Sequence, residues 1–116
     1  MWITRSPLGL TAVDRMGHLA GRIEGTLPSD GSNPEFALVR LGGRFAGRTP
    51  VPLRCALRYD ATLQFPYDRE DMRDAPTVES ARFEEDQILS ARTYWGTHRP
   101  EAGRISFDAI AAGRDA

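Results

Sequence analysis

The feature that most constrains the fold is a succession of short alternating segments in the first two-thirds of the chain, separated by turns rich in glycine, proline and aspartate. In the clearest segment, 20–27, Ile23 and Leu27 share one face with Gly21 and Gly25, while charged and hydroxyl side chains take the other face. A period of two is typical of a half-buried strand. The inward glycines indicate close backbone approach or strong curvature. Several such strands at close spacing predict a small, mostly β domain.

The remaining elements follow from similar signals. Further strands are predicted at residues 10–13, 36–41, 49–53, 57–59 and 62–67. A short helical turn is expected over 68–74, with Asp68 as its N-cap and Asp71 in the position of a capping-box acid. A longer helix is predicted over 83–95, because acidic residues crowd its first turn and Gly96 follows as a C-terminal cap. Its apolar stripe is Ile88, Ala91 and Trp95.

The strand at 36–41 is apolar on both faces. If Ala37 and its alternate neighbours fill the interior of a small barrel, then Phe36 and Leu38 point outward and need another cover. The C-terminal helix could cover them, which would give a monomer. A second copy of the chain could do so instead, and the sequence analysis favours this twofold homodimer.

Charge is distributed unevenly. Every cationic side chain other than histidine is arginine. Residues 1–58 carry eight arginines and four acids, a net charge of +4, while residues 59–116 carry seven arginines and twelve acids, a net charge of −5, and the two sum to −1. This asymmetry favours contact between the halves, within one chain or across a dimer. The overall charge argues against a protein dominated by phosphate contacts.

No residue pattern predicts catalysis, a cofactor or a metal ion. Cys55 is the sole cysteine, which excludes an internal disulfide, and its apolar neighbours predict a small core residue. His18 is expected to be a surface turn residue. The glycine-rich loop at 42–47 lacks the lysine and hydroxyl residue of an ATP-binding loop. The chain is therefore predicted not to be an enzyme.

Several motifs, read in order, resemble the PRC-barrel family. They are Val13-Asp14-Arg15-Met16-Gly17-His18, Ala20 to Gly25, Phe36 to Gly43, Val51-Pro52-Leu53 and Phe65 to Pro76. The resemblance covers about residues 8–76, and Tyr94-Trp95-Gly96 looks like the end of the helix that follows the barrel in many bacterial members. The glycine loop at 42–47 is shorter than the family pattern, and the strand before Asp30 lacks the acidic turn residues often found there.

The resemblance implies a small antiparallel β-barrel at residues 1–80, with a helix at 81–96 packed on the barrel or on a dimer partner, and a mobile tail at 97–116. Members of the family serve as docking domains of photosynthetic complexes, as the second domain of a ribosome maturation factor and as standalone proteins. The expected function is therefore a non-catalytic, cytoplasmic docking or adaptor module, without membrane insertion, that binds an unidentified protein partner and forms a homodimer.

The expected interaction surface combines apolar, aromatic and basic side chains. It comprises Phe36, Leu38, Arg40, Arg44, Phe45, Arg48 and Trp95. The alternative is an RNA- or ribosome-associated factor that uses the basic surface from Arg40 to Arg54. Phe45 would then stack on a base among the arginines. Nucleic-acid binding is not the favoured function.

Overall fold

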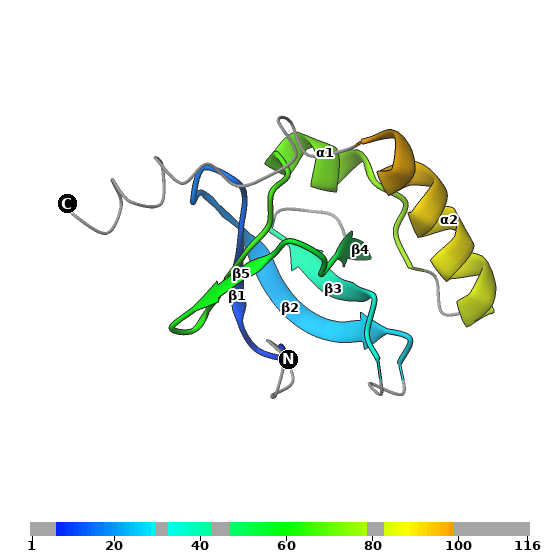
Figure 1. The fold of residues 1–116 in the computed structure, drawn as a ribbon, viewed down its shortest axis with the longest axis horizontal. Helices are drawn as coiled ribbons and strands as arrows, with labels where there is room; N and C mark the ends of the chain where they lie inside the picture. Colours follow the sequence, from blue (N-terminus) through cyan, green and yellow to red (C-terminus); the bar gives the residue numbers. More distant parts are fainter. Residues whose placement is uncertain (1–6, 30–32, 43–46, 79–82, 99–116) are drawn as a thin grey trace.

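The computed structural model describes residues 7–29, 33–42, 47–78 and 83–98 (Figure 1). The described part contains six strands followed by two helices. In chain order they are β1 Thr11–Val13, β2 Leu19–Leu27, β3 Phe36–Leu41, β4 Arg48–Pro52, β5 Leu57–Tyr59, β6 Thr62–Gln64, α1 Arg69–Asp74 and α2 Glu84–Thr97. The mostly β composition and the C-terminal helix expected from the sequence are therefore confirmed. The tail beyond residue 98 lies outside the described residues.

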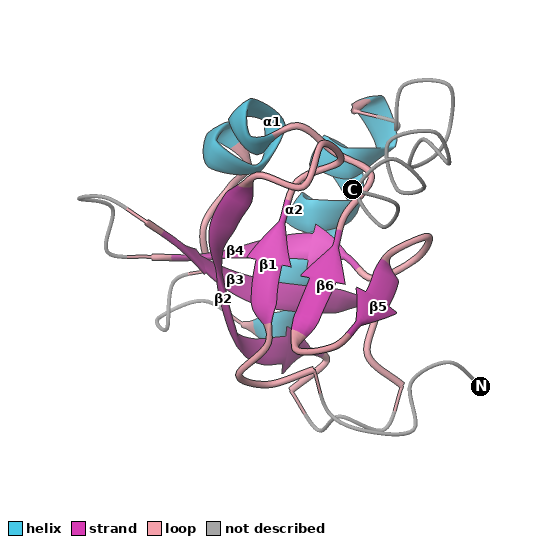
Figure 2. Ribbon diagram, turned by 90° about the vertical axis from the view of Figure 1, so that its left-hand side faces the viewer, coloured by secondary structure: helices cyan, strands magenta, loops and turns pink. Residues whose placement is uncertain are grey.

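The six strands form one mixed sheet in the order β4-β3-β2-β1-β6-β5. Strands β1 and β6 are parallel, and Figure 2 shows them side by side with their arrows in the same direction. The other pairings are antiparallel. The pairing is therefore mostly antiparallel and β1–β6 is the exception, with four further strands between these two along the chain. The sheet is not closed, and β4 and β5 are its edge strands.

Strand β2 contains a bulge that the period-two pattern did not reveal. Ile23 lies opposite Val39 and Gly25 lies opposite Leu38, which leaves Glu24 as an extra residue. A bulge bends its strand and shifts the alternation of its side chains. Ile23 and Leu27 therefore do not share one face, yet both are buried because the strand curves strongly (Figure 1).

Close backbone approach, expected at the two inward glycines, is confirmed at Gly21. A Cβ atom at this position would fall well inside contact distance of the carbonyl oxygen of Arg40 on β3. At Gly25 the nearest atom is a side-chain methyl of Leu38, 3.2 Å from the position of a Cβ. At Gly21, therefore, backbone atoms of the neighbouring strand leave no room for a side chain.

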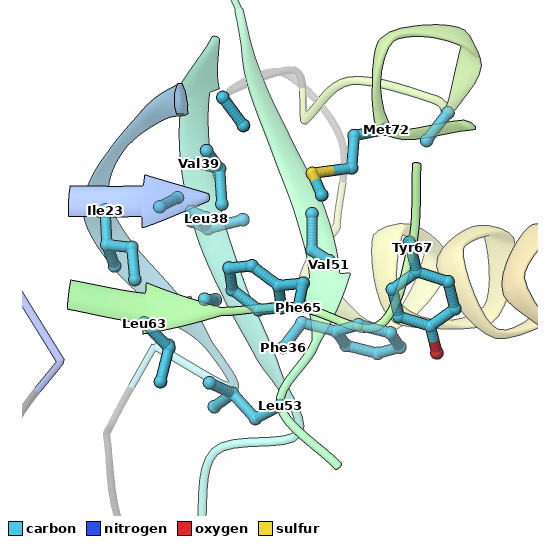
Figure 3. Packing of buried hydrophobic residues seen from close by; sticks show 14 of the residues in the cluster. Ile23, Phe36, Leu38, Val39, Val51, Leu53, Leu63, Phe65, Tyr67 and Met72 are labelled. Atoms are coloured by element: carbon cyan, nitrogen blue, oxygen red, sulfur yellow. The ribbon is translucent and has the colours of Figure 1, made fainter. Parts of the chain in front are cut away.

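Phe36 and Leu38, which the sequence predicted to need a cover, are covered by the chain itself. They are 2% and 5% exposed, and their neighbours Ala37 and Val39 are buried too. The chain itself covers both faces of β3, and Phe36 lines a recess together with Trp95 of α2. Figure 3 shows Phe36 and Leu38 within the apolar cluster. Helix α2, and not the second copy that the sequence analysis favoured, therefore shields Phe36.

Helix α2 covers the edge strand β4. The indole N–H of Trp95 donates to the carbonyl oxygen of Pro50 at 2.7 Å, which satisfies a buried acceptor on this edge. Ala91 and Trp95 of the expected stripe are buried, whereas Ile88 is only partly buried. The helix continues through Gly96 to Thr97, so Gly96 is not the cap that the sequence predicted.

Helix α1 begins at the expected place but without the expected cap. Asp68 is the N-cap residue, yet its side chain makes no capping hydrogen bond. Its carboxylate instead accepts from Nε of Arg15 at 2.6 Å. A long-range ion pair therefore replaces the predicted capping box with Asp71, and it ties the start of α1 to the turn after β1.

Candidate docking surface

The structure does not bring all the residues of the expected interaction surface together at the protein surface. Phe36, Leu38 and Trp95 are buried, so they are unavailable to a partner in this fold. Arg44 and Phe45 lie outside the described residues. Only the two remaining members, Arg40 and Arg48, lie together at the protein surface, directly opposite each other on β3 and β4.

Arg40 belongs to a row of arginines that crosses three strands. Arg22 on β2 lies opposite Arg40, which in turn lies opposite Arg48. Nε of Arg40 donates to Oε2 of Glu24 at 2.8 Å, and this carboxylate raises the pKa of the Arg40 guanidinium. Like charges directly opposite each other destabilise a sheet. The single acid, Glu24, offsets only part of that repulsion.

A second arginine pair lies on α1. Arg69 and Arg73 are four residues apart, so they lie on the same side of the helix. Nε of Arg69 lies 3.7 Å from Oδ2 of Asp14, and one of its Nη atoms donates to the carbonyl oxygen of Leu19 at 3.4 Å. Their spacing in sequence is enough to place these two arginines on one face of α1. Which face of α1 lies toward β2 depends on how the helix packs in the fold.

The two arginine pairs line two adjoining hollows in the surface. A hollow of about 370 Å³ reaches Arg22 and Arg40, and a hollow of about 200 Å³ reaches Arg69 and Arg73. Both hollows share the residues Leu19, Gly21, Leu41 and Gly42. We call this combined feature the arginine recess: its floor is these four shared residues, and its rim is the four arginines.

The floor of the arginine recess carries a strongly exposed apolar side chain. Leu19 is 64% exposed, although it begins a strand that pairs with β1. Asp14 holds the preceding turn, because its buried carboxylate accepts the backbone N–H groups of Met16 and His18 at 2.9 and 2.8 Å. His18 is an exposed turn residue, as expected. The turn therefore presents Leu19 in a defined position beside the arginines.

A second recess, of about 280 Å³, lies between the sheet and α2, and its lining is mainly structural. Tyr67 and Trp95 pack with ring centroids 4.4 Å apart, and burial raises the pKa of the Tyr67 hydroxyl. Glu35 accepts two hydrogen bonds from Arg92, at 2.7 and 2.8 Å, which lower the pKa of its carboxyl group. These contacts fasten α2 to the start of β3.

Cys55 lies at the surface, contrary to the prediction of a core residue. Its φ of 69° places it in a left-handed turn between β4 and β5. Its apolar sequence neighbours were therefore misleading. Within the described ranges, no three His, Cys, Asp or Glu side chains gather closely enough to hold a metal ion.

No protein-family model and no curated protein matches the chain. Among the helices that the structure describes, neither has the length and apolar character needed to cross a membrane. A functional inference must therefore start from the arginine recess and its surroundings.

Proposed function

We propose that this chain is a non-catalytic docking module of PRC-barrel type that binds another protein through the arginine recess. The order of the sequence motifs and the strong curvature of β2 support the barrel relationship. The observation that carries the docking function is Leu19, a 64% exposed leucine that lines the same hollows as four arginines. Single exposed leucines are common on protein surfaces, so the position of Leu19 beside the arginines supports the docking function more than its exposure does.

A concave patch of this composition suits a protein partner. Interfaces combine an apolar centre with a polar rim, and arginine is enriched in them. The floor residues Leu19 and Leu41 would provide the apolar centre, and the guanidinium groups would provide directional hydrogen-bond donors. Binding would cover Leu19 and thereby remove apolar surface from water.

Site-specific photo-crosslinking tests the docking function. A photoreactive amino acid replaces Leu19 in one variant and Leu89 in a matched control, since both leucines are similarly exposed, at 64% and 57%, and Leu89 lies on α2. We expect a discrete protein adduct in cells from position 19 and none of that mass from position 89. Identical adduct patterns from the two positions would contradict a docking role for the recess.

The second candidate function is RNA binding, which the row of Arg22, Arg40 and Arg48 favours. Three guanidinium groups on adjacent strands could contact successive phosphates. Filter binding at low and moderate salt tests this function, because phosphate-driven binding weakens steeply as salt rises. Absence of RNA binding at low salt would eliminate it.

A further inference from the structure

The arginine recess concentrates charge in two arrangements that are each unfavourable for folding. Arg22 and Arg40 lie directly opposite each other across two strands, and Arg69 and Arg73 lie one helical turn apart. Like charges in either arrangement repel. The two pairs line adjoining hollows that share four residues, so the local structure favours a ligand that brings negative charge to both.

The acids that form ion pairs with these arginines compensate only half of their charge. Glu24 pairs with Arg40, and Asp14 lies 3.7 Å from Arg69. Arg22 and Arg73 form no ion pair with any side chain in the described part of the chain. Among the four arginines and the two acids that pair with them, two positive charges remain uncompensated, one on the rim of each hollow.

The floor between the guanidinium groups of Arg22 and Arg73 is apolar. Leu19 and Leu41 line both hollows, and Gly21 and Gly42 leave the centre without side chains. A bare phosphate or a plain polyanion would satisfy the rim but leave Leu19 in water. A ligand that matches the whole recess therefore carries an apolar group between two anionic groups.

We infer that the arginine recess binds an acidic peptide segment in which an apolar side chain is flanked by carboxylates. The apolar side chain packs on Leu19 and Leu41, one carboxylate pairs with Arg22, and another pairs with Arg73. Guanidinium groups bind carboxylates through two parallel hydrogen bonds, which favours carboxylates in defined positions over diffuse negative charge. This inference rests on the proposed docking function and specifies the chemistry of its partner.

Other ligands match the recess less well. An anionic membrane is flat and would contact a protruding surface, whereas Leu19 lines a hollow. Bases of single-stranded nucleic acid stack on aromatic rings, and no aromatic side chain from the described segments lines this hollow. An acidic peptide uses both the charge and the apolar floor.

The test uses the full chain and three fluorescent probe peptides in anisotropy titrations. The first peptide holds one leucine between paired glutamates, the second replaces that leucine with serine, and the third replaces the glutamates with glutamines. We expect the first peptide to bind, and each replacement to weaken binding at least tenfold. Equal binding of the leucine and serine peptides would overturn the inference, since charge alone would then suffice.

Protein variants locate the binding site. Arg22→Gln and Arg73→Gln are each expected to weaken binding of the first peptide about tenfold, and Leu19→Ser is expected to do so as well. Arg54→Gln is the matched control, because it removes the same charge from an exposed turn that follows β4 at Pro52. The recess lies near the opposite end of the β3–β4 ladder, where Arg40 is opposite Arg48. An equal effect of Arg54→Gln would overturn the assignment to the recess.

Three further measurements identify the competing ligands. Tighter binding of single-stranded RNA than of the first peptide, or Leu19-dependent binding to anionic phospholipid vesicles, would overturn the peptide class. A dimer that Arg22→Gln dissociates would assign the recess to a second copy. If the photo-crosslinker at position 19 still captures a protein while all three peptides fail, the docking function stands and only the acidic-peptide chemistry is wrong.

Discussion

Gly21 shows how one residue can determine the curvature of a strand. A Cβ at this position would meet the backbone oxygen of Arg40, which cannot move without breaking the pairing of β2 with β3. We expect Gly21→Ala to lower the free energy of unfolding by about 1–3 kcal/mol, the usual cost of overpacking. Gly42→Ala is the control, because a Cβ there meets no atom within 4 Å. Chemical denaturation of both variants measures the difference, and equal stabilities would refute the steric argument.

Glu35 and Arg92 predict a pH dependence at the residue scale. Hydrogen bonds from Arg92 lower the pKa of Glu35 in the folded chain below its ordinary value of 4.5. The pair therefore stabilises the fold above that value, and this contribution disappears as the pH falls through the lowered pKa. We expect Arg92→Gln to raise the Glu35 pKa, as followed by NMR titration, and to cause a small loss of stability near neutral pH that vanishes in acid. An unchanged Glu35 pKa would show that the pair does not form in solution.

Single residues were predicted well where local geometry alone decides their role. Close approach at Gly21 followed from its place on an alternating strand, and the turn position of His18 followed from its neighbours. The cover over Phe36 and the exposure of Cys55 could not be predicted in this way, because they depend on distant elements and on one backbone angle. The arginine recess was missed for the same reason, since Arg69 and Arg73 reach it only through the docking of α1.

At the scale of elements, α2 contains a glycine whose replacement by alanine is expected to stabilise the fold, the opposite of the effect expected at Gly21. Gly96 lies within the helix, and a Cβ there meets no atom within 4 Å. We expect Gly96→Ala to raise the free energy of unfolding by about 0.5 kcal/mol, because alanine favours a helix and loses less backbone entropy than glycine. Gly17→Ala is the contrast, since its φ of 86° is strained for any side chain. The midpoint temperature of thermal unfolding should rise for Gly96→Ala and fall for Gly17→Ala. A lower midpoint for Gly96→Ala would show that Gly96 is the C-terminal cap that the sequence predicted.

Element positions were predictable from the sequence, but element details were not. Hydrophobic periodicity and acidic residues in the first turn located β3 and α2 to within a few residues. The bulge at Glu24 has no signal of its own, because it appears only in the pairing of β2 with β3. Similarly, the Asp68 carboxylate accepts a hydrogen bond from Arg15, 53 residues away in sequence, instead of making the expected capping hydrogen bond.

At the scale of the whole molecule, the parallel pairing of β1 with β6 determines how the sheet is assembled. Local turns predict neighbours along the chain, and each antiparallel hairpin in the sheet joins consecutive strands. The β1–β6 contact instead joins segments about fifty residues apart. It brings α1, which follows β6, close to the turn before β2, where Arg15 pairs with Asp68 and Arg69 contacts Leu19. The arginine recess is therefore a product of the global topology.

The oligomeric state is the last prediction at this scale. The dimer was expected because Phe36 and Leu38 needed a cover, and both are already buried within one chain. We therefore expect the other alternative, a monomer at micromolar concentration in sedimentation velocity. Phe36→Asp would bury a carboxylate in the apolar cluster, so it should unfold the chain rather than separate two folded copies.

Circular dichroism of Phe36→Asp, with Leu89→Asp as an exposed control, distinguishes these outcomes. Unfolding of Phe36→Asp alone would support burial by the chain's own helix. A wild-type dimer, together with a folded, monomeric Phe36→Asp variant, would restore the homodimer. That result would also mean that Phe36 is released from its recess beside Trp95, because a residue buried inside one chain cannot lie at an interface.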